Sequence, residues 1–209
     1  MMYRLILLLA ILGCSSLAVS AEALSDTAKA LYQSRCAACH QVAGEGSEAL
    51  KAPNISGLSE AYIARQLQHF QSGLRGADQA DSAGQMMAAA VVGLSSTDLD
   101  ALASYVADLN DVRLFSERQA TGFRGRGLYS VCSSCHGAQG EGNIALGAPR
   151  LNQQHSWYLV TQLENYKQGI RGAKSNDEYG QQMRAMAESV HEDDVELLVR
   201  HISGLGLQP

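Results

Sequence analysis

The sequence predicts an all-α protein built from two similar units in tandem. Apolar residues recur at helical spacing in several segments, whereas no segment of useful length alternates apolar and polar residues as a half-buried strand would. The chain also repeats itself at a fixed offset of 96 residues. A repeat of this kind indicates a duplicated domain of about 90 residues. Periodicity therefore predicts the fold class, and the repeat predicts the number of domains.

The repeat starts at two Cys-x-x-Cys-His motifs and keeps its register, without a gap, to the end of the chain. The matching positions include Cys36 with Cys132, Cys39 with Cys135, His40 with His136, Gly44-Glu45-Gly46 with Gly140-Glu141-Gly142, Pro53 with Pro149, Arg75 with Arg171, and Met87 with Met183. This agreement predicts a first domain over residues 22–110 and a second over residues 123–209. The linker between them, residues 111–122, is short, so we expect the domains to lie side by side with limited freedom.

Serine caps and apolar stripes predict two of the helices in each unit. Ser59 can cap a helix over residues 59–72, and residues 156–167 repeat its pattern. Ser95 can cap the last helix of the first unit. The stripe of that helix is Leu99, Leu102, Val106 and Leu109, and its counterpart in the second unit is Val195, Leu198, Ile202 and Leu205. We interpret these stripes as core.

A third helix is predicted before each Cys-x-x-Cys-His motif. Its candidates are residues 27–36 in the first unit and residues 127–132 in the second. Gly125 and Gly127 weaken the second candidate, because glycine is a poor helix former.

Residues 1–21 have the layout of a secretory signal. Arg4 precedes the apolar stretch 5–12, and small residues follow as far as Ala21. The apolar stretch is too short to span a bilayer as a permanent helix. Residues 11–14 also loosely resemble a lipobox, which makes a lipid on Cys14 the alternative. We therefore expect an exported, periplasmic protein that is either soluble or peripherally associated with the membrane.

The charge balance excludes nucleic acid as a partner. Without the predicted signal, the chain holds 15 Lys plus Arg against 21 Asp plus Glu, and no basic stripe is present. The charge is also uneven: residues 22–110 hold 10 acidic and 5 basic side chains, whereas residues 123–209 hold 9 and 8. We therefore expect the first domain to meet a basic partner surface.

The two Cys-x-x-Cys-His motifs predict two covalently bound haem c groups. Two thiols at this spacing can add to the two vinyl groups of a porphyrin, and the adjacent imidazole then lies beneath the iron. One four-thiolate zinc site is the alternative. It is disfavoured because each Cys pair has its own His and its own domain. Thioredoxin-type chemistry is disfavoured because it needs a free dithiol without a following His.

Met87 and Met183 are the predicted distal ligands of the two irons. A duplicated site should supply its ligand twice at the same offset, and beyond the start of the chain these two are the methionines that correspond. No histidine other than His40 and His136 recurs. Met86 and Met186 remain the alternative ligands. For any one of these methionines, the alternative to a ligand is a core filler, which is the more usual role of methionine.

Small helical units with Cys-x-x-Cys-His near the start and a Met before the last helix resemble class I cytochrome c. Two of them in tandem, with Gly-Leu-Arg-Gly-Ala at 73–77 and Gly-Ile-Arg-Gly-Ala at 169–173, resemble the dihaem cytochrome c4 family over essentially the whole mature chain. The resemblance implies two tandem class I cytochrome c domains. It also implies that His40 and His136 are proximal ligands and that Met87 and Met183 are distal ligands.

The resemblance also assigns roles to two repeated pairs outside the ligand set. The carbonyls of Pro53 and Pro149 would orient the proximal imidazoles, the alternative being simple turn prolines. Arg75 and Arg171 would pair with haem propionates, the alternative being solvated loop arginines.

Irons with both axial positions filled leave no vacancy for a substrate, so we expect an electron carrier and not an enzyme. The main hypothesis is a carrier between a quinol-oxidising complex and a terminal oxidase of a respiratory chain. The alternatives are a dihaem electron-accepting subunit of a periplasmic dehydrogenase and a peroxidase-type enzyme, which would need a removable sixth ligand. The uneven charge further predicts that the two haems differ in potential.

Overall fold

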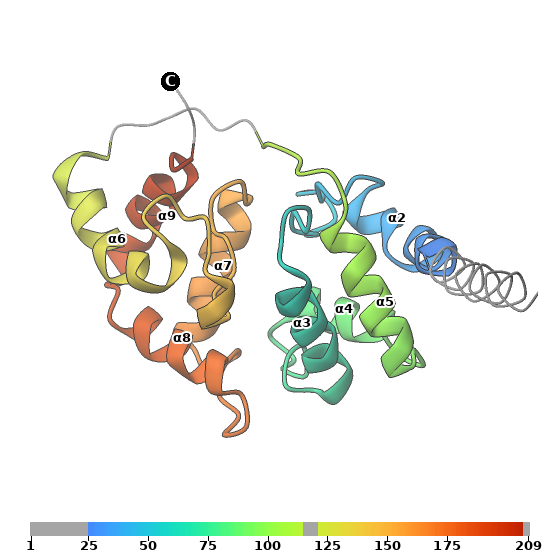
Figure 1. Ribbon diagram of the computed structural model, residues 1–209. Helices are drawn as coiled ribbons and strands as arrows, with labels where there is room; N and C mark the ends of the chain where they lie inside the picture. The colour runs from blue at the N-terminus through green and yellow to red at the C-terminus, as the bar shows by residue number, and fades with distance from the viewer. Residues whose placement is uncertain (1–24, 115–120, 207–209) are drawn as a thin grey trace, which may run out of the picture.

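The computed structural model describes residues 25–114 and 121–206, which form two groups of helices side by side (Figure 1). Three parts of the sequence predictions lie outside the described residues: the signal, Cys14 and residues 115–120 of the linker. Within the described residues the regular structure is helical, apart from two isolated bridges, Ser47–Ala52 and Asn143–Ala148. The all-α prediction is therefore confirmed. None of the described helices is long and apolar enough to cross a membrane.

The first domain is held together by helices from both of its ends. After a helical segment over residues 25–35, its elements are α2 (Ala37–His40), α3 (Glu60–Ser72), α4 (Ser82–Ala90) and α5 (Ser96–Ala107). Helix α3 packs on α5. The buried cluster at its centre consists of Tyr32, Ile63, Leu102, Ala103 and Val106. The predicted stripes of the 59–72 and 95–109 segments therefore face the core, as expected.

The second domain repeats this arrangement with small changes. Its elements are α6 (Gly122–His136), η1 (Ile144–Leu146), α7 (Ser156–Lys167), α8 (Glu178–Glu188), η2 (Glu192–Asp194) and α9 (Val195–Ser203). The buried cluster contains Tyr129, Leu159, Val190, Val195, Leu198, Val199 and Ile202. Residues from the first, middle and last helices thus meet in the core of each domain, and in the first domain Phe70, Val91 and Leu99 form a second buried cluster.

The predicted serine caps are present in the first domain. Ser59 Oγ accepts a hydrogen bond from the Tyr62 amide, and Ser95 forms a reciprocal capping box with Asp98. His191 stands in the place of Ser95 in the second domain, and there the chain makes the short 3₁₀ turn η2 before α9. Leu109 and Leu205 lie just beyond the ends of α5 and α9, so the helices are shorter than the stripes predicted, although both side chains still pack on the cores.

Helix α6 is longer than its sequence predicted. It begins at Gly122 and not at Gly127, and it contains both glycines that were expected to weaken it. A Cβ on Gly125 would lie 2.5 Å from the Thr121 side chain and 3.3 Å from the Cβ of His201 on α9. Thr121 Oγ1 and His201 Nδ1 are hydrogen-bonded at 2.8 Å. Glycine at 125 therefore permits the close packing of α6 on α9, which compensates for its poor helix propensity.

Two helices, α4 and α8, were not predicted. Each is capped by an aspartate: Asp81 accepts a hydrogen bond from the Gly84 amide, and Asp177 accepts one from the Gly180 amide, both at 2.8 Å. Asp81 and Asp177 are themselves separated by the 96-residue offset. That repeated pair is the sequence signal that would have located both helices.

Candidate functional site

The imidazoles of His40 and His136 are buried and held in one orientation. His40 Nδ1 lies 3.0 Å from the carbonyl oxygen of Pro53, and His136 Nδ1 lies 2.8 Å from that of Pro149. A carbonyl can only accept, so Nδ1 carries the proton in each ring and Nε2 keeps its lone pair. The expectation that the two prolines orient the imidazoles is thus confirmed, and Nε2 is the ring atom that can bind iron.

Burial also keeps these imidazoles neutral. It lowers the pKa of His40 and of His136 from the usual value, and the hydrogen bond to the proline carbonyl opposes this effect only in part. The neutral ring is the form that ligates a metal. The electrostatics of the two sites therefore agree with their geometry.

A compact loop brings each proline carbonyl to its histidine. The amide of Gly46 donates to the His40 carbonyl at 3.0 Å, and a Cβ on Gly46 would lie only 2.5 Å from the Pro53 carbonyl oxygen. Gly46 adopts φ +81°, which is readily accessible to glycine. Gly142 repeats the contact with His136 at 2.8 Å. The repeated Gly-Glu-Gly stretch, to which the sequence assigned no role, is therefore what folds the loop around the histidine of each motif.

None of the four cysteines of the motifs forms a disulfide among the described residues. Burial raises the pKa of the Cys36 thiol to about 11 and also raises that of Cys132. Both thiols are thus protonated and weakly nucleophilic at neutral pH.

One continuous cavity of about 560 Å³ extends through both domains, and its wall is largely apolar. The predicted site residues that line it are Cys36, His40, Met87, Cys132, Cys135, His136 and Met183, whereas Cys39 is exposed and does not. Of the alternative methionines, Met186 lines the cavity, while Met86 does not and is 58% exposed. Thiols, a neutral imidazole with a free Nε2 and apolar walls fit a covalently held haem in each domain.

Comparison with known proteins gives the family. A family model described as Cytochrome c matches residues 25–110 and, a second time, residues 123–206. Cytochrome c4 of Azotobacter vinelandii is 32% identical over 213 residues, which cover 96% of this chain and 98% of that relative. The chain belongs to the cytochrome c4 family. It is an electron-transfer protein with two covalently bound haem c groups, one for each Cys-x-x-Cys-His motif, and it is not an enzyme.

Two further comparisons agree with membership of the cytochrome c4 family. The crystal structure of reduced recombinant cytochrome c4 from Pseudomonas stutzeri superimposes with a TM-score of 0.71 at 28% identity, covering 87% of this chain and 98% of that one. A thiosulfate dehydrogenase electron acceptor of Stutzerimonas stutzeri is 28% identical over 182 residues, covering 82% of this chain and 79% of its own. The predicted fold of two tandem cytochrome c domains is confirmed.

Tight backbone contacts position α4 and α8, the helices that carry Met87 and Met183 in this cytochrome. A Cβ on Gly172, whose φ is +76°, would lie 2.2 Å from the Gly180 carbonyl oxygen in the first turn of α8. Gly76 makes the equivalent contact with Gly84 in α4. Met183 lies one turn after Gly180, so the Gly172 contact holds Met183 against the cavity.

Replacing Gly172 with Ala should push α8 away from its loop. We expect the free energy of unfolding to fall by about 1–3 kcal/mol, the range for overpacking. We also expect the iron–sulfur charge-transfer band of the second domain to weaken, and urea unfolding with absorption spectra would measure both effects. Gly93→Ala is the matched control, because Gly93 has φ +77° but nothing within 4 Å of a Cβ. Equal losses in the two variants would contradict the positional role of the contact.

A symmetric hydrogen-bond network joins the domains at the cavity. Arg75 donates through Nη1 to Gln66 of its own domain at 2.8 Å, and through Nη2 to Tyr158 and Gln162 of the other at 2.8 and 3.0 Å. Arg171 makes the same pattern in reverse, with bonds to Gln162, Tyr62 and Gln66. Both arginines are buried, with 8% and 7% exposure. The alternative of solvated loop arginines is therefore wrong.

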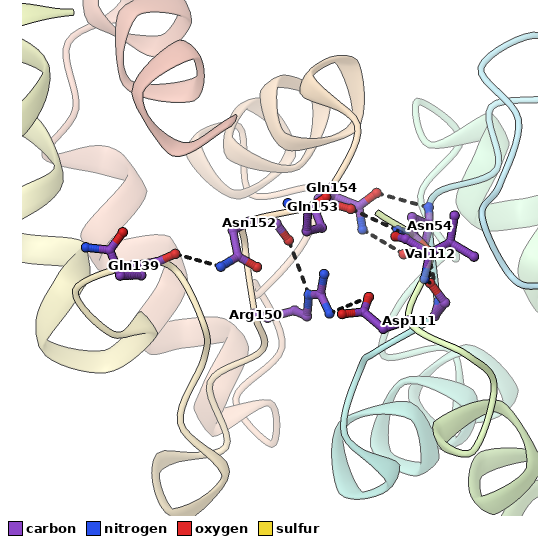
Figure 2. Close-up of polar contacts among 9 residues, drawn as sticks. Asn54, Asp111, Val112, Gln139, Arg150, Asn152, Gln153 and Gln154 are labelled. Carbon is purple, nitrogen blue, oxygen red and sulfur yellow. Dashed lines mark hydrogen bonds and ion pairs between the residues drawn. The ribbon is translucent and has the colours of Figure 1, made fainter. Parts of the chain in front are cut away.

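A second set of contacts fixes the start of the linker between the domains (Figure 2). The Asn54 side chain donates to the Gln153 carbonyl at 2.9 Å. The side chain of Gln154 accepts a hydrogen bond from the Asn54 backbone N–H through Oε1 and donates one to the Asn54 carbonyl through Nε2. Arg150 pairs with Asp111 at 2.8 Å. The expected side-by-side placement with limited freedom is thus supported by direct bonds between the domains.

Sequence reasoning missed one further pair, which supports the chain directly after the two motif histidines. Tyr32 and Tyr129 are buried, and their hydroxyls donate at 2.7 Å to the carbonyls of Gln41 and Gly137, the residues that directly follow the two histidines. The tyrosines are 97 residues apart and not 96, so the repeat register pairs Tyr32 with Leu128 and hides the correspondence.

Proposed function

We propose that this cytochrome is a periplasmic carrier that takes electrons from a quinol-oxidising complex and delivers them toward a terminal oxidase. In this proposal a signal over residues 1–21 is removed, and residues 22–110 and 123–209 each hold one haem on either side of the 111–122 linker. His40 with Met87 and His136 with Met183 are the proposed axial pairs. The thiols of Cys36, Cys39, Cys132 and Cys135 hold the porphyrins.

The observation that carries the proposal is the shared cavity. In each domain a neutral imidazole, oriented by a proline carbonyl, and a methionine from the helix capped by aspartate line the same space. Haem held between these groups supplies reversible one-electron redox chemistry at a high potential, because thioether sulfur favours the reduced iron. The buried bonds between the domains keep the two sites in one rigid molecule, which suits a carrier.

The test is a reconstituted electron-transfer assay with the mature dihaem protein. The carrier should be reduced by membranes that contain a quinol-oxidising complex and reoxidised by membranes that contain an oxidase. The first step should slow as ionic strength rises, because the acidic first domain is proposed to meet a basic surface. Reduction at a rate that does not depend on salt would contradict the docking proposal, and failure of both steps would contradict the carrier.

A second candidate is an electron acceptor bound to a dehydrogenase. The thiosulfate dehydrogenase electron acceptor among its relatives favours it. This candidate predicts that the native protein elutes in size-exclusion chromatography as part of a larger complex, whereas the free carrier elutes at the size of the single chain. Mass spectrometry of the same sample reports the N-terminus and so separates cleavage after Ala21 from a lipid on Cys14.

A further inference from the structure

Buried nitrogen donors at the contact between the domains lack a partner among the described residues. Three of them are Nε of Arg65, Nε of Arg75 and Nε1 of Trp157. All three side chains line the shared cavity. An unsatisfied buried donor costs about 1–3 kcal/mol, so such atoms indicate where an acceptor from outside the chain binds.

Trp157 belongs to α7 of the second domain but faces the first. Lys51 Nζ lies 5.2 Å from the centroid of its indole ring. His155, whose ring stacks on the indole, donates from Nε2 to the Glu45 carbonyl at 2.9 Å. Lys51 precedes Pro53 by two residues, and the Pro53 carbonyl orients His40. The indole therefore lies against the loop that supports the proximal histidine of the opposite domain.

Arg65, on α3 of the first domain, makes the corresponding contact with the second domain. Its Nη2 donates to the Gly147 carbonyl at 2.6 Å, and its guanidinium lies 4.1 Å from the ring centroid of Tyr179. Gly147 is the repeat equivalent of Lys51 and precedes Pro149 by two residues. Both crossing side chains thus reach equivalent loops of the opposite domain.

The repeat does not duplicate either of these two donor side chains. The positions equivalent to Trp157 and Arg65 are Ala61 and Thr161, which offer no comparable long donor. Each cavity half therefore receives a different donor from across the domain contact: an indole N–H beside a lysine on one side and a guanidinium on the other.

We propose that Trp157 Nε1 and Arg65 Nε are donors to haem propionates across the domain contact, Trp157 to the first domain's haem and Arg65 to the second's. The propionates are the carboxylate acceptors that a covalently attached haem brings into this cavity. A donor or cation at a carboxylate reduces the negative charge felt by the iron, which favours the reduced state. Each domain therefore helps to set the redox potential of the other domain's haem. The proposal depends on the two bound haems and not on the identity of the redox partners.

The single tryptophan of the chain permits a direct test in the mature dihaem protein. An ¹⁵N-labelled indole gives one N–H resonance. We expect this N–H to be protected from exchange with solvent and to shift when the first-domain haem is oxidised. Exchange at the rate of a free indole, or a shift that follows only the second-domain haem, would overturn the assignment.

Variants test the effect on potential, with each haem followed by its own methyl resonances during a redox titration. Trp157→Phe keeps the aromatic ring beside Lys51 and removes only the N–H, so the first-domain potential should fall while the second stays. Arg65→Gln should produce the opposite pattern. Gln154→Ala is the control, since it removes two bonds between the domains but no unpaired donor. If Gln154→Ala lowers the potentials as much, or Trp157→Phe lowers neither, the proposal is wrong.

Discussion

Replacing Met87 with His should lower the redox potential of the first haem and leave that of the second unchanged. Met183→His should lower the potential of the second haem and leave that of the first unchanged. An imidazole in place of the thioether no longer favours the reduced iron. We expect a fall of more than about 59 mV, a tenfold change in a one-electron equilibrium. The iron–sulfur charge-transfer band of the altered domain should also disappear. A spectroelectrochemical titration of the dihaem protein measures both effects.

The matched controls are the neighbouring methionines. Met86→His and Met186→His should leave both potentials and both bands intact. Met86 is exposed and does not line the cavity, which makes it the stricter control, whereas Met186 does line it. A band that survives in the Met183→His protein and vanishes in the Met186→His protein would transfer the distal role in the second domain to Met186.

The surroundings of His40 and His136 could be predicted from the sequence because their determinants are local. Cys36, Cys39 and His40 lie within five residues, and the Pro53 carbonyl is only 13 positions from the histidine that it orients. Such short-range geometry recurs wherever the motif recurs. The repeat therefore predicted both histidine–proline contacts, and the repeated pair of Asp81 and Asp177 would have added α4 and α8.

The contacts between the domains could not be predicted in the same way. Nothing in the sequence near Arg75 indicated that its bonds would reach Tyr158 and Gln162, which are 83 and 87 positions away. No local pattern encodes how one domain lies on the other, because that depends on the shapes of two complete surfaces. The repeat did preserve the partners, since Tyr62 and Gln66 recur as Tyr158 and Gln162, but it gave no sign that each pair crosses to the opposite arginine.

Arg171→Met should cause a large loss of stability, because it breaks the buried network between the domains. Burial opposes the charge of Arg171, but the neighbouring phenols of Tyr166 and Tyr62 raise its pKa on balance, so the guanidinium stays charged. Its removal breaks three hydrogen bonds, two of them between the domains. At about 1 kcal/mol for each bond, the free energy of unfolding should fall by about 3 kcal/mol. Urea unfolding of the dihaem protein measures this loss.

The loss should also have a structural signature, because methionine fills the space of Arg171 without bonding Gln66 or Tyr62. We expect the two domains to separate more readily, which small-angle scattering would detect as a larger radius of gyration. Arg200→Met is the matched control: Arg200 is exposed on α9 of the same domain, so its replacement should change stability by no more than about 0.5 kcal/mol. Similar losses in the two variants would mean that the buried network contributes little, and that the linker contacts at Asn54 and Arg150 hold the domains together.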